Sequence, residues 1–307
     1  MNYLLMVFLV ISGSILFAGH PSAVANPDSV PAPAPSSKSD FLPVFGGQAV
    51  YKVVKGDTIE GIGAQLGVNW TRIVKDNHID IKKILRIGQE LRVNTRRIVP
   101  KSINNGIIIN IPDRMLYFFK DGRLDMAFPV GLGKSSWMTP EGPFIITFKQ
   151  KNPTWHVPVS IQQEMEMKGK PVKTIVVLPG PDNPLGRYVV KTSIRNIEIH
   201  ETIWPTSVYQ FRSHGCIRVL PQNIEKFYEE VKMNTPGELI YMPVKVARLE
   251  SGRIFLEVHK DIYSKIPDLR DETNRHIEKA GLAGKVDWQK VETMLKEKTG
   301  IAEDVTL

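Results

Sequence analysis

The chain has 307 residues, of which 42% are apolar, and it carries a net charge of +8. This length and apolar fraction suit a globular protein with two domains and connecting segments. The positive charge is spread along the chain, without the dense run of Lys and Arg or the recognition helix typical of nucleic-acid binders. We therefore expect an acidic partner that is not nucleic acid.

The first 25 residues form a distinct segment, because they contain no Lys, Arg, Asp or Glu. An apolar run from Tyr3 to Ala18, short for a membrane span, leads to small residues that end at Ala25. This pattern predicts a secretory signal peptide over residues 1–25, cut after Ala25. An uncleaved anchor is the alternative, since only the terminal amine supplies positive charge. We expect an exported protein of the periplasm or cell wall.

Residues 26–47 are rich in Pro, Ala and Ser. Such a segment buries too little apolar surface to fold, and its prolines favour an extended backbone. The sequence predicts a linker that holds the folded part of the chain away from the membrane.

A small folded unit follows the linker, with the pattern strand, helix, helix, strand. Residues Tyr51–Val54 alternate like a short strand, and Glu90–Val93 form a closing strand. Asp57 is placed to cap the first helix at its N-terminus, and Gly67 to end it. Asn69 is placed to cap the second helix.

This unit, over residues 48–95, resembles the lysin motif (LysM), which binds the N-acetylglucosamine backbone of peptidoglycan or chitin. The phrases that carry the resemblance are YKVVKGDTIEGIGAQLGVNW and ILRIGQELRV. It implies a sugar groove between the first and last loops of the unit, with one wall at Gly56, Asp57 and Thr58 and the other around Gly88. The alternative for Asp57 and Thr58 is a purely capping role.

The next part of the chain, residues 104–243, is rich in strands and in long Pro-containing loops. We predict an α+β, predominantly β domain that is β-sandwich-like and has few helices. The expected strands are Ile107–Ile111, Met115–Phe119, Met126–Val130, Phe144–Lys149, Tyr188–Thr192, Ile197–His200 and Glu238–Met242. Residues 244–307 predict a C-terminal extension with one strand, Ile254–Val258, and a charged helix packed on the main body.

The chain has one cysteine, Cys216. Exported proteins that use cysteine structurally do so in pairs, because the compartment outside the cytoplasm oxidises thiols to disulfides. An unpaired thiol there is either a small buried hydrophobic residue or a reactive group. A reactive thiol needs a base or a positive neighbour to become a thiolate.

Two histidines compete to be that base. His214 stands two residues before Cys216, but the chain bends between them at Gly215. His200 ends an alternating strand and can approach the cysteine from a neighbouring strand, the usual Cys–His arrangement. Gly215 also lets the backbone approach a substrate, and Arg218 is a permanent cation near the thiol. Zinc bound by the two histidines and the cysteine is the alternative, although a structural site would need a fourth ligand.

The stretch IEIHETIWPTSVYQFRSHGCIRV resembles the signature of the L,D-transpeptidase catalytic domain, and the likeness extends from about Ile107 to Tyr241. The resemblance implies Cys216 as nucleophile and His200 as general base. It implies substrate-shaping roles for Ser213, His214 and Arg218, and an oxyanion hole made by the amides of Gly215 and Cys216.

In this family the residue after the base holds the histidine through its backbone carbonyl, and many members have glycine there. This chain has Glu201 at that position. A backbone role survives the change, but a carboxylate could add charge beside the site.

The implied reaction is acyl transfer on the tetrapeptide stems of peptidoglycan, through a thioester and with no metal or organic cofactor. The product is a 3–3 crosslink, a protein attached to the wall, or an exchanged amino acid. With water as acceptor the enzyme would be an L,D-carboxypeptidase. An inactive glycan-binding scaffold, in which only the LysM unit functions, is the competing hypothesis.

Overall fold

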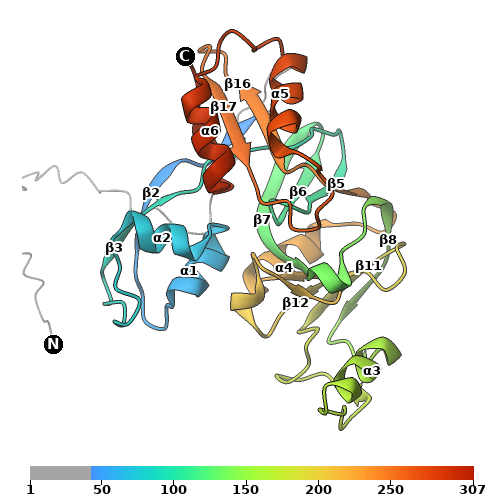
Figure 1. Ribbon diagram of the computed structural model, residues 1–307. Coiled ribbons are helices and arrows are strands. Elements are labelled where there is room, and N and C mark those ends of the chain that lie inside the picture. The colour runs from blue at the N-terminus through green and yellow to red at the C-terminus, as the bar shows by residue number, and fades with distance from the viewer. Residues whose placement is uncertain (1–42) are drawn as a thin grey trace, which may run out of the picture. The chain divides into compact units, whose positions relative to one another are not determined.

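The computed structural model describes residues 43–307 (Figure 1). The predicted signal peptide and nearly all of the predicted linker lie outside the described residues. Among residues 43–307, no helix has the length and apolar composition needed to span a bilayer.

The N-terminal unit has the predicted order of elements. Its strands pair antiparallel, with Tyr51 opposite Leu91. The bounds are β2 Gln48–Lys52, α1 Ile59–Leu66, α2 Trp70–Asp76 and β3 Glu90–Asn94. A short pair, β1 Val44–Phe45 with β4 Arg97–Ile98, flanks the unit. Side chains from all four main elements and from Ile301 near the C-terminus form one apolar core.

The cap of α1 corrects one prediction. The N-cap is Thr58, whose side chain accepts a hydrogen bond from the Gly61 amide at 3.0 Å. Asp57 instead accepts from the Val54 amide at 2.8 Å and from the Tyr51 hydroxyl at 2.9 Å, so it shapes the turn before the helix. Adjacent Asp and Thr can both cap a helix, and sequence alone does not choose between them. The predicted stop at Gly67 and the predicted cap at Asn69 are confirmed.

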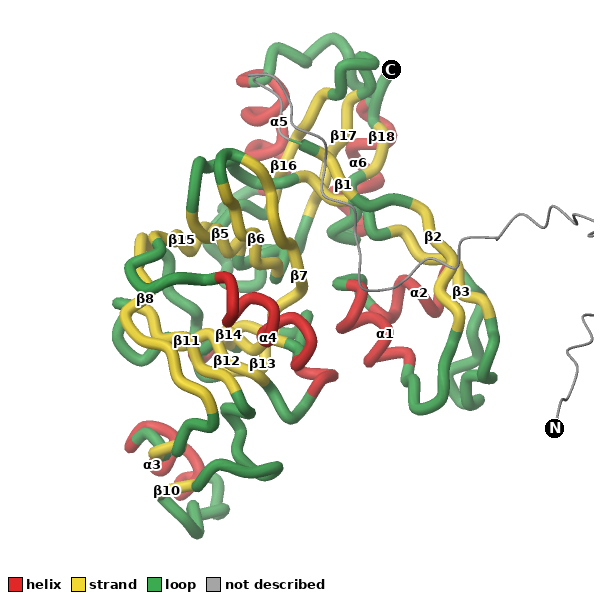
Figure 2. The backbone as a smooth tube through the Cα atoms, turned by 180° about the vertical axis from the view of Figure 1, so that it is seen from behind, coloured by secondary structure: helices red, strands yellow, loops and turns green. Residues whose placement is uncertain are grey.

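The central domain is built on one nine-stranded sheet, which confirms the predominantly β prediction. The strand order is β13-β7-β14-β12-β11-β8-β15-β5-β6, and β6 also pairs with β7, so the sheet closes on itself (Figure 2). The bounds are β5 Gly106–Asn110, β6 Met115–Lys120, β7 Arg123–Gly133, β8 Gly142–Lys151, β11 Tyr188–Thr192, β12 Glu198–Glu201, β13 Phe211–Ser213, β14 Ile217–Val219 and β15 Pro236–Ile240.

One apolar cluster fills the interior of this sheet. Each strand gives alternate residues to it, as a half-buried strand does. Helix α4, Pro221–Glu230, adds Ile224 and Phe227 to the same cluster. Two short 3₁₀ turns, Ser135–Trp137 and Pro205–Ser207, lie in the loops after β7 and β12.

An insertion between β8 and β11 was not predicted. It contains α3, Val159–Met167, and the short antiparallel pair β9 Trp155–His156 with β10 Val176–Val177. Helix α3 has no fully buried residue. Without an apolar face of its own, it gives no periodic signal in the sequence.

The C-terminal extension is more structured than predicted. Besides the expected strand β17, Ile254–Val258, it has β16 Val244–Arg248, β18 Glu303–Asp304, α5 Leu269–Lys279 and α6 Trp288–Glu297. The three strands form a sheet of their own, and both helices pack on it around a separate apolar core. The extension is therefore a small α+β layer rather than one strand with one packed helix.

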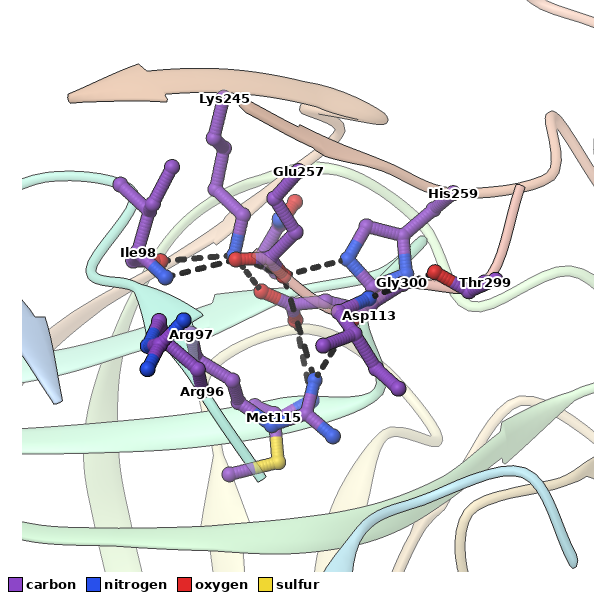
Figure 3. A network of polar contacts seen from close by, with 12 residues as sticks. Arg96, Arg97, Ile98, Asp113, Met115, Lys245, Glu257, His259, Thr299 and Gly300 are labelled. Atoms are coloured by element: carbon purple, nitrogen blue, oxygen red, sulfur yellow. Dashed lines mark hydrogen bonds and ion pairs between the residues drawn. The ribbon is translucent and has the colours of Figure 1, made fainter. Parts of the chain in front are cut away.

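A buried charge network ties this extension to the central domain (Figure 3). The Lys245 ammonium lies 2.7 Å from the Asp113 carboxylate and 2.8 Å from the Glu257 carboxylate, and all three side chains are fully buried. Glu257 also accepts from the Ile98 amide at 2.6 Å, and Arg97 lies 3.9 Å from it. Lys245 and Arg97 thus lie among the carboxylates of Asp113 and Glu257, out of contact with solvent. Such a buried group of charges is stable only while every partner is present.

Removal of the central cation should therefore be costly. We expect Lys245→Met to lower the free energy of unfolding by about 3–5 kcal/mol, because two buried carboxylates lose their shared partner. The matched control is Lys101→Met, which breaks the exposed Lys101–Glu238 pair and should cost less than about 1 kcal/mol. Urea denaturation of both variants measures the difference, and equal losses would contradict the role given to the network.

Candidate active site

The site is built on two neighbouring parallel strands. In the β12–β14 pair, His200 lies opposite Arg218 and Ile199 opposite Ile217. Paired residues of a sheet point to the same face, and successive residues point to opposite faces. Both isoleucines lie in the apolar core. His200 and Arg218 therefore share the other face, and Cys216 lies directly before β14, two residues before Arg218.

His200 is held in one orientation and one tautomer. Its Nδ1 lies 2.6 Å from the Glu201 carbonyl oxygen, as predicted. Since a carbonyl only accepts, Nδ1 carries the proton and Nε2 presents its lone pair. The side chain is buried, and this burial lowers the pKa of His200 to about 4, against the opposing effect of the Glu201 carbonyl. At neutral pH the imidazole is an uncharged base.

The Glu201 carboxylate does not add free charge to the site. It is buried, and it accepts hydrogen bonds from the Arg187 amide at 3.0 Å and the Arg187 guanidinium at 3.3 Å. Gly186 makes room for it, because a Cβ at that position would lie 2.5 Å from the Glu201 side chain. Strand alternation points this carboxylate away from the face that bears His200.

The Cys216 thiol is free and partly buried. Its Sγ lies 3.4 Å from the Asn196 carbonyl oxygen, beside the start of β12. Burial raises the pKa of the Cys216 thiol to about 11, although the Glu198 amide and the Arg218 charge act in the opposite direction. The thiol and the His200 imidazole are thus both neutral at rest. A neutral thiol attacks a carbonyl only when a base takes its proton.

The turn before Cys216 is tied by Ser213. Its hydroxyl donates to the Cys216 carbonyl oxygen at 2.6 Å and accepts from the Gly215 amide at 3.1 Å. Ser213 is almost fully buried, so it shapes the loop from within. Because the Gly215 amide is already engaged, the Cys216 amide is the better placed of the two predicted oxyanion donors.

Gly215 has a conformation that suits glycine. Its φ is +107°, and a Cβ there would lie 3.1 Å from the Ile197 side chain. Its carbonyl oxygen accepts a hydrogen bond from the Thr139 hydroxyl at 2.8 Å, and Thr139 is fully buried. Thr139 begins the TPEGPF turn, to which the sequence analysis gave no role.

His214 points to the inserted segment instead of the thiol. Its Nε2 lies 2.7 Å from the Glu164 carboxylate on α3, and its ring packs edge-on against Trp137 at 5.3 Å. Glu164 also pairs with Lys134 at 2.7 Å and with Lys168. The two lysines and His214 hold the pKa of Glu164 well below its usual range. No sequence signal linked Glu164 to a histidine 50 positions away.

The side chain of Arg218, two residues after Cys216, is restrained by an aromatic neighbour. Its guanidinium lies 5.5 Å from the centre of the Trp204 ring, a stacking that restrains its long side chain. Burial lowers the pKa of Arg218, and the neighbouring Cys216 works against that change. A fixed cation on the reactive face suits a carboxylate of a substrate.

The predicted residues of the N-terminal unit meet at one edge. The Gly88 amide donates to the Val53 carbonyl oxygen at 2.8 Å, which brings the last loop against the turn that contains Gly56, Asp57 and Thr58. Gly56 and Gly88 both have positive φ, +93° and +82°. Apolar side chains beside these loops are exposed, 55% for Val54, 94% for Ile84 and 71% for Ile87.

The zinc alternative would need Cys216, His200 and His214 to converge. His214 instead bonds Glu164, and His200 uses Nδ1 on a carbonyl. Within residues 43–307, the group with metal-binding donors is Asp113, Glu257 and His259, in the buried network. There the Lys245 ammonium already bonds both carboxylates, so the cation between them belongs to the protein.

Comparison with known proteins identifies the class. The family model described as L,D-transpeptidase catalytic domain (YkuD) matches residues 104–246, and the LysM domain model matches residues 51–94. The chain therefore contains an L,D-transpeptidase catalytic domain and a LysM domain.

Among its relatives is the protein named "Probable L,D-transpeptidase ErfK/SrfK" of Escherichia coli K12, with 27% identity over 83% of this chain and 81% of the relative. Another is "Probable L,D-transpeptidase YcfS" of the same organism, with 26% identity over 72% and 71%. Among solved structures, L,D-transpeptidase 3 of Mycobacterium tuberculosis has a TM-score of 0.35 and 14% identity over 51% of this chain and 76% of that chain.

The raised pKa of Cys216 gives a test of the resting state. A thiolate forms only as the pH approaches about 11. The rate of alkylation by iodoacetamide should therefore rise about tenfold per pH unit between about pH 8 and about pH 10, whereas an ordinary thiol levels off near its pKa of about 8.5. Intact mass at timed intervals measures the rate. A plateau by about pH 8.5 would contradict the neutral resting thiol.

Proposed function

We propose that this protein is an exported L,D-transpeptidase that acts on the peptide stems of peptidoglycan through a thioester on Cys216. One observation carries the proposal. His200, with its imidazole oriented by the Glu201 carbonyl, lies opposite Arg218 in the β12–β14 pair, and the free Cys216 thiol comes directly before β14. The family of the catalytic domain supports the same reaction.

In the first half-reaction, the Cys216 sulfur attacks the carbonyl carbon of the L,D bond that follows the third residue of a tetrapeptide stem. His200 Nε2 takes the thiol proton, and the Cys216 amide donates to the oxygen that becomes negative. The C–N bond then breaks, the departing D-alanine nitrogen takes the proton from the imidazolium, and the acyl group stays on sulfur as a thioester.

In the second half-reaction, an amine attacks the thioester, a new amide bond forms and the C–S bond breaks. His200 accepts a proton from the amine and returns one to the sulfur. A stem amine gives a 3–3 crosslink, an amine of a protein gives wall attachment, and a free D-amino acid gives exchange. Water would give L,D-carboxypeptidase activity. Analysis of the muropeptides formed from purified wall fragments distinguishes these products.

Arg218 supplies the contact for an acidic substrate. The third residue of such a stem, often diaminopimelate, has a carboxylate of its own, and a bidentate guanidinium is the preferred protein partner for that group. Trp204 keeps the guanidinium near the thiol. This pairing favours stems that carry a free carboxylate close to the bond that is cut.

The LysM domain serves as a tether in this proposal. Its exposed apolar side chains beside the loops of Gly56 and Gly88 suit the faces of sugar rings. Binding to glycan raises the local concentration of stems around the catalytic domain. The expected signal peptide would place both domains in the periplasm or cell wall, where the substrate is. The inactive scaffold is the less favoured function, because the chain keeps both Cys216 and His200 of the catalytic signature.

A covalent adduct tests the nucleophile. Carbapenems acylate enzymes of this class, so we expect one adduct per chain by intact mass spectrometry, and none in Cys216→Ala. The absence of any adduct on the unmodified protein would favour the scaffold. An adduct that persists in Cys216→Ala would assign the chemistry to another residue.

The base is tested by the rate of the same reaction. We expect His200→Ala to slow acylation by at least about a hundredfold, because the variant lacks the base assigned to the thiol proton. The matched control is His276→Ala, which removes an imidazole paired with Glu272 on α5. Timed mass spectra give both rates, and similar rates in the two variants would remove His200 from this role.

A further inference from the structure

The geometry points to Tyr263, in the C-terminal extension, as a positioning residue that orients the oxyanion-binding amide of Cys216 through Thr139. This inference rests on the proposed function, since it concerns the same acyl-transfer site. It also gives a role to a residue that lies beyond the segment matched by the catalytic-domain family.

Four hydrogen bonds connect Tyr263 to the nucleophile loop. The Tyr263 hydroxyl donates to the Gly133 carbonyl oxygen at 2.6 Å and accepts from the Thr139 amide at 3.1 Å. The Thr139 hydroxyl accepts from the Gly133 amide at 2.9 Å and donates to the Gly215 carbonyl oxygen at 2.8 Å. The phenol thus bonds both ends of the loop 133–139, and the Thr139 hydroxyl connects this loop to Gly215.

The last of these bonds fixes the direction of the Cys216 amide. Gly215 C=O and Cys216 N–H belong to one peptide unit, and in a planar trans peptide the two groups point in opposite directions. A carbonyl held by Thr139 therefore aims the Cys216 N–H away from Thr139. Gly215 has no side chain to limit rotation of this peptide, so the Thr139 bond adds a restraint from outside the loop to the one that Ser213 supplies from within.

Tyr263 is itself held from several sides. Its ring packs edge-on against Phe211 at 5.8 Å and stacks on Tyr241 at 5.8 Å. Its amide donates to the Tyr241 hydroxyl at 3.0 Å, and that hydroxyl bonds Asp261. Both Tyr263 and Thr139 are buried, 8% and 0% exposed. Water therefore does not replace the phenol, and its loss leaves two main-chain groups unpaired.

A purely structural role would affect every reaction of the thiol, whereas a role in oxyanion binding affects only attack on a carbonyl. Alkylation by iodoacetamide displaces iodide from a CH₂ carbon and forms no oxyanion. Carbapenem acylation forms one. Comparing the two rates in one variant thus separates loop orientation from general loosening of the site.

We expect Tyr263→Phe to lower the carbapenem acylation rate about tenfold and to leave the alkylation rate within about twofold of the unmodified protein. Unchanged acylation, or equal losses in both reactions, would overturn the inference. Tyr188→Phe is the matched control, because Tyr188 is equally buried in the same core and its hydroxyl bonds Glu225. It should leave both rates unchanged.

Thr139 gives the second arm of the test. Thr139→Ser keeps the hydroxyl and should retain acylation, while Thr139→Val removes it and should lose acylation at least as strongly as Tyr263→Phe. Equal acylation by the serine and valine variants would contradict the connection through Thr139. If the unmodified protein itself forms no carbapenem adduct, the proposed function fails, which is a different result from an adduct that forms equally fast in every variant.

Discussion

The parallel pairing of β12 with β14 is the constraint on which the site depends. It places isoleucines from both strands in the core and the reactive side chains on the opposite face. A shift of one residue would bury His200 among apolar groups and expose Ile199. The free energy gained by burying the isoleucines therefore also maintains the alignment of His200 with Arg218.

Burial sets the resting charge states of His200 and Cys216. An apolar surrounding disfavours a charged form, and it moves the pKa values of His200 and Cys216 in opposite directions, to about 4 and about 11. Both groups rest uncharged at neutral pH. In the proposed reaction, charge then appears only when a carbonyl oxygen and the imidazole become charged together. Fixed donors such as the Cys216 amide act most strongly under these conditions.

Local patterns predicted much of the fold, and they indicated candidate residues for the site. Alternation located most strands of the central sheet, and the spacing of His200 and Cys216, with the family resemblance, indicated their pairing. Contacts between distant segments were not predictable in this way. Nothing near Thr139, Glu164 or Tyr263 in the sequence shows which residues they meet. The prediction of Asp57 as the helix cap was wrong for a different reason. Asp and Thr are both favoured at the N-cap, so the local pattern does not choose between Asp57 and Thr58.

The connections that complete the site have a consequence for folding. Thr139 meets Gly215 across 76 positions and Tyr263 across 124, and Lys245 meets Asp113 across 132. Contacts of such high sequence separation close large loops, and chains dominated by them fold slowly. An intermediate with a formed central sheet but an undocked C-terminal extension would have its nucleophile in place while the peptide beside it could still rotate. The native secondary structure would then form before the site is complete. Docking of the C-terminal extension would be the last step of folding, and it would orient the Cys216 amide.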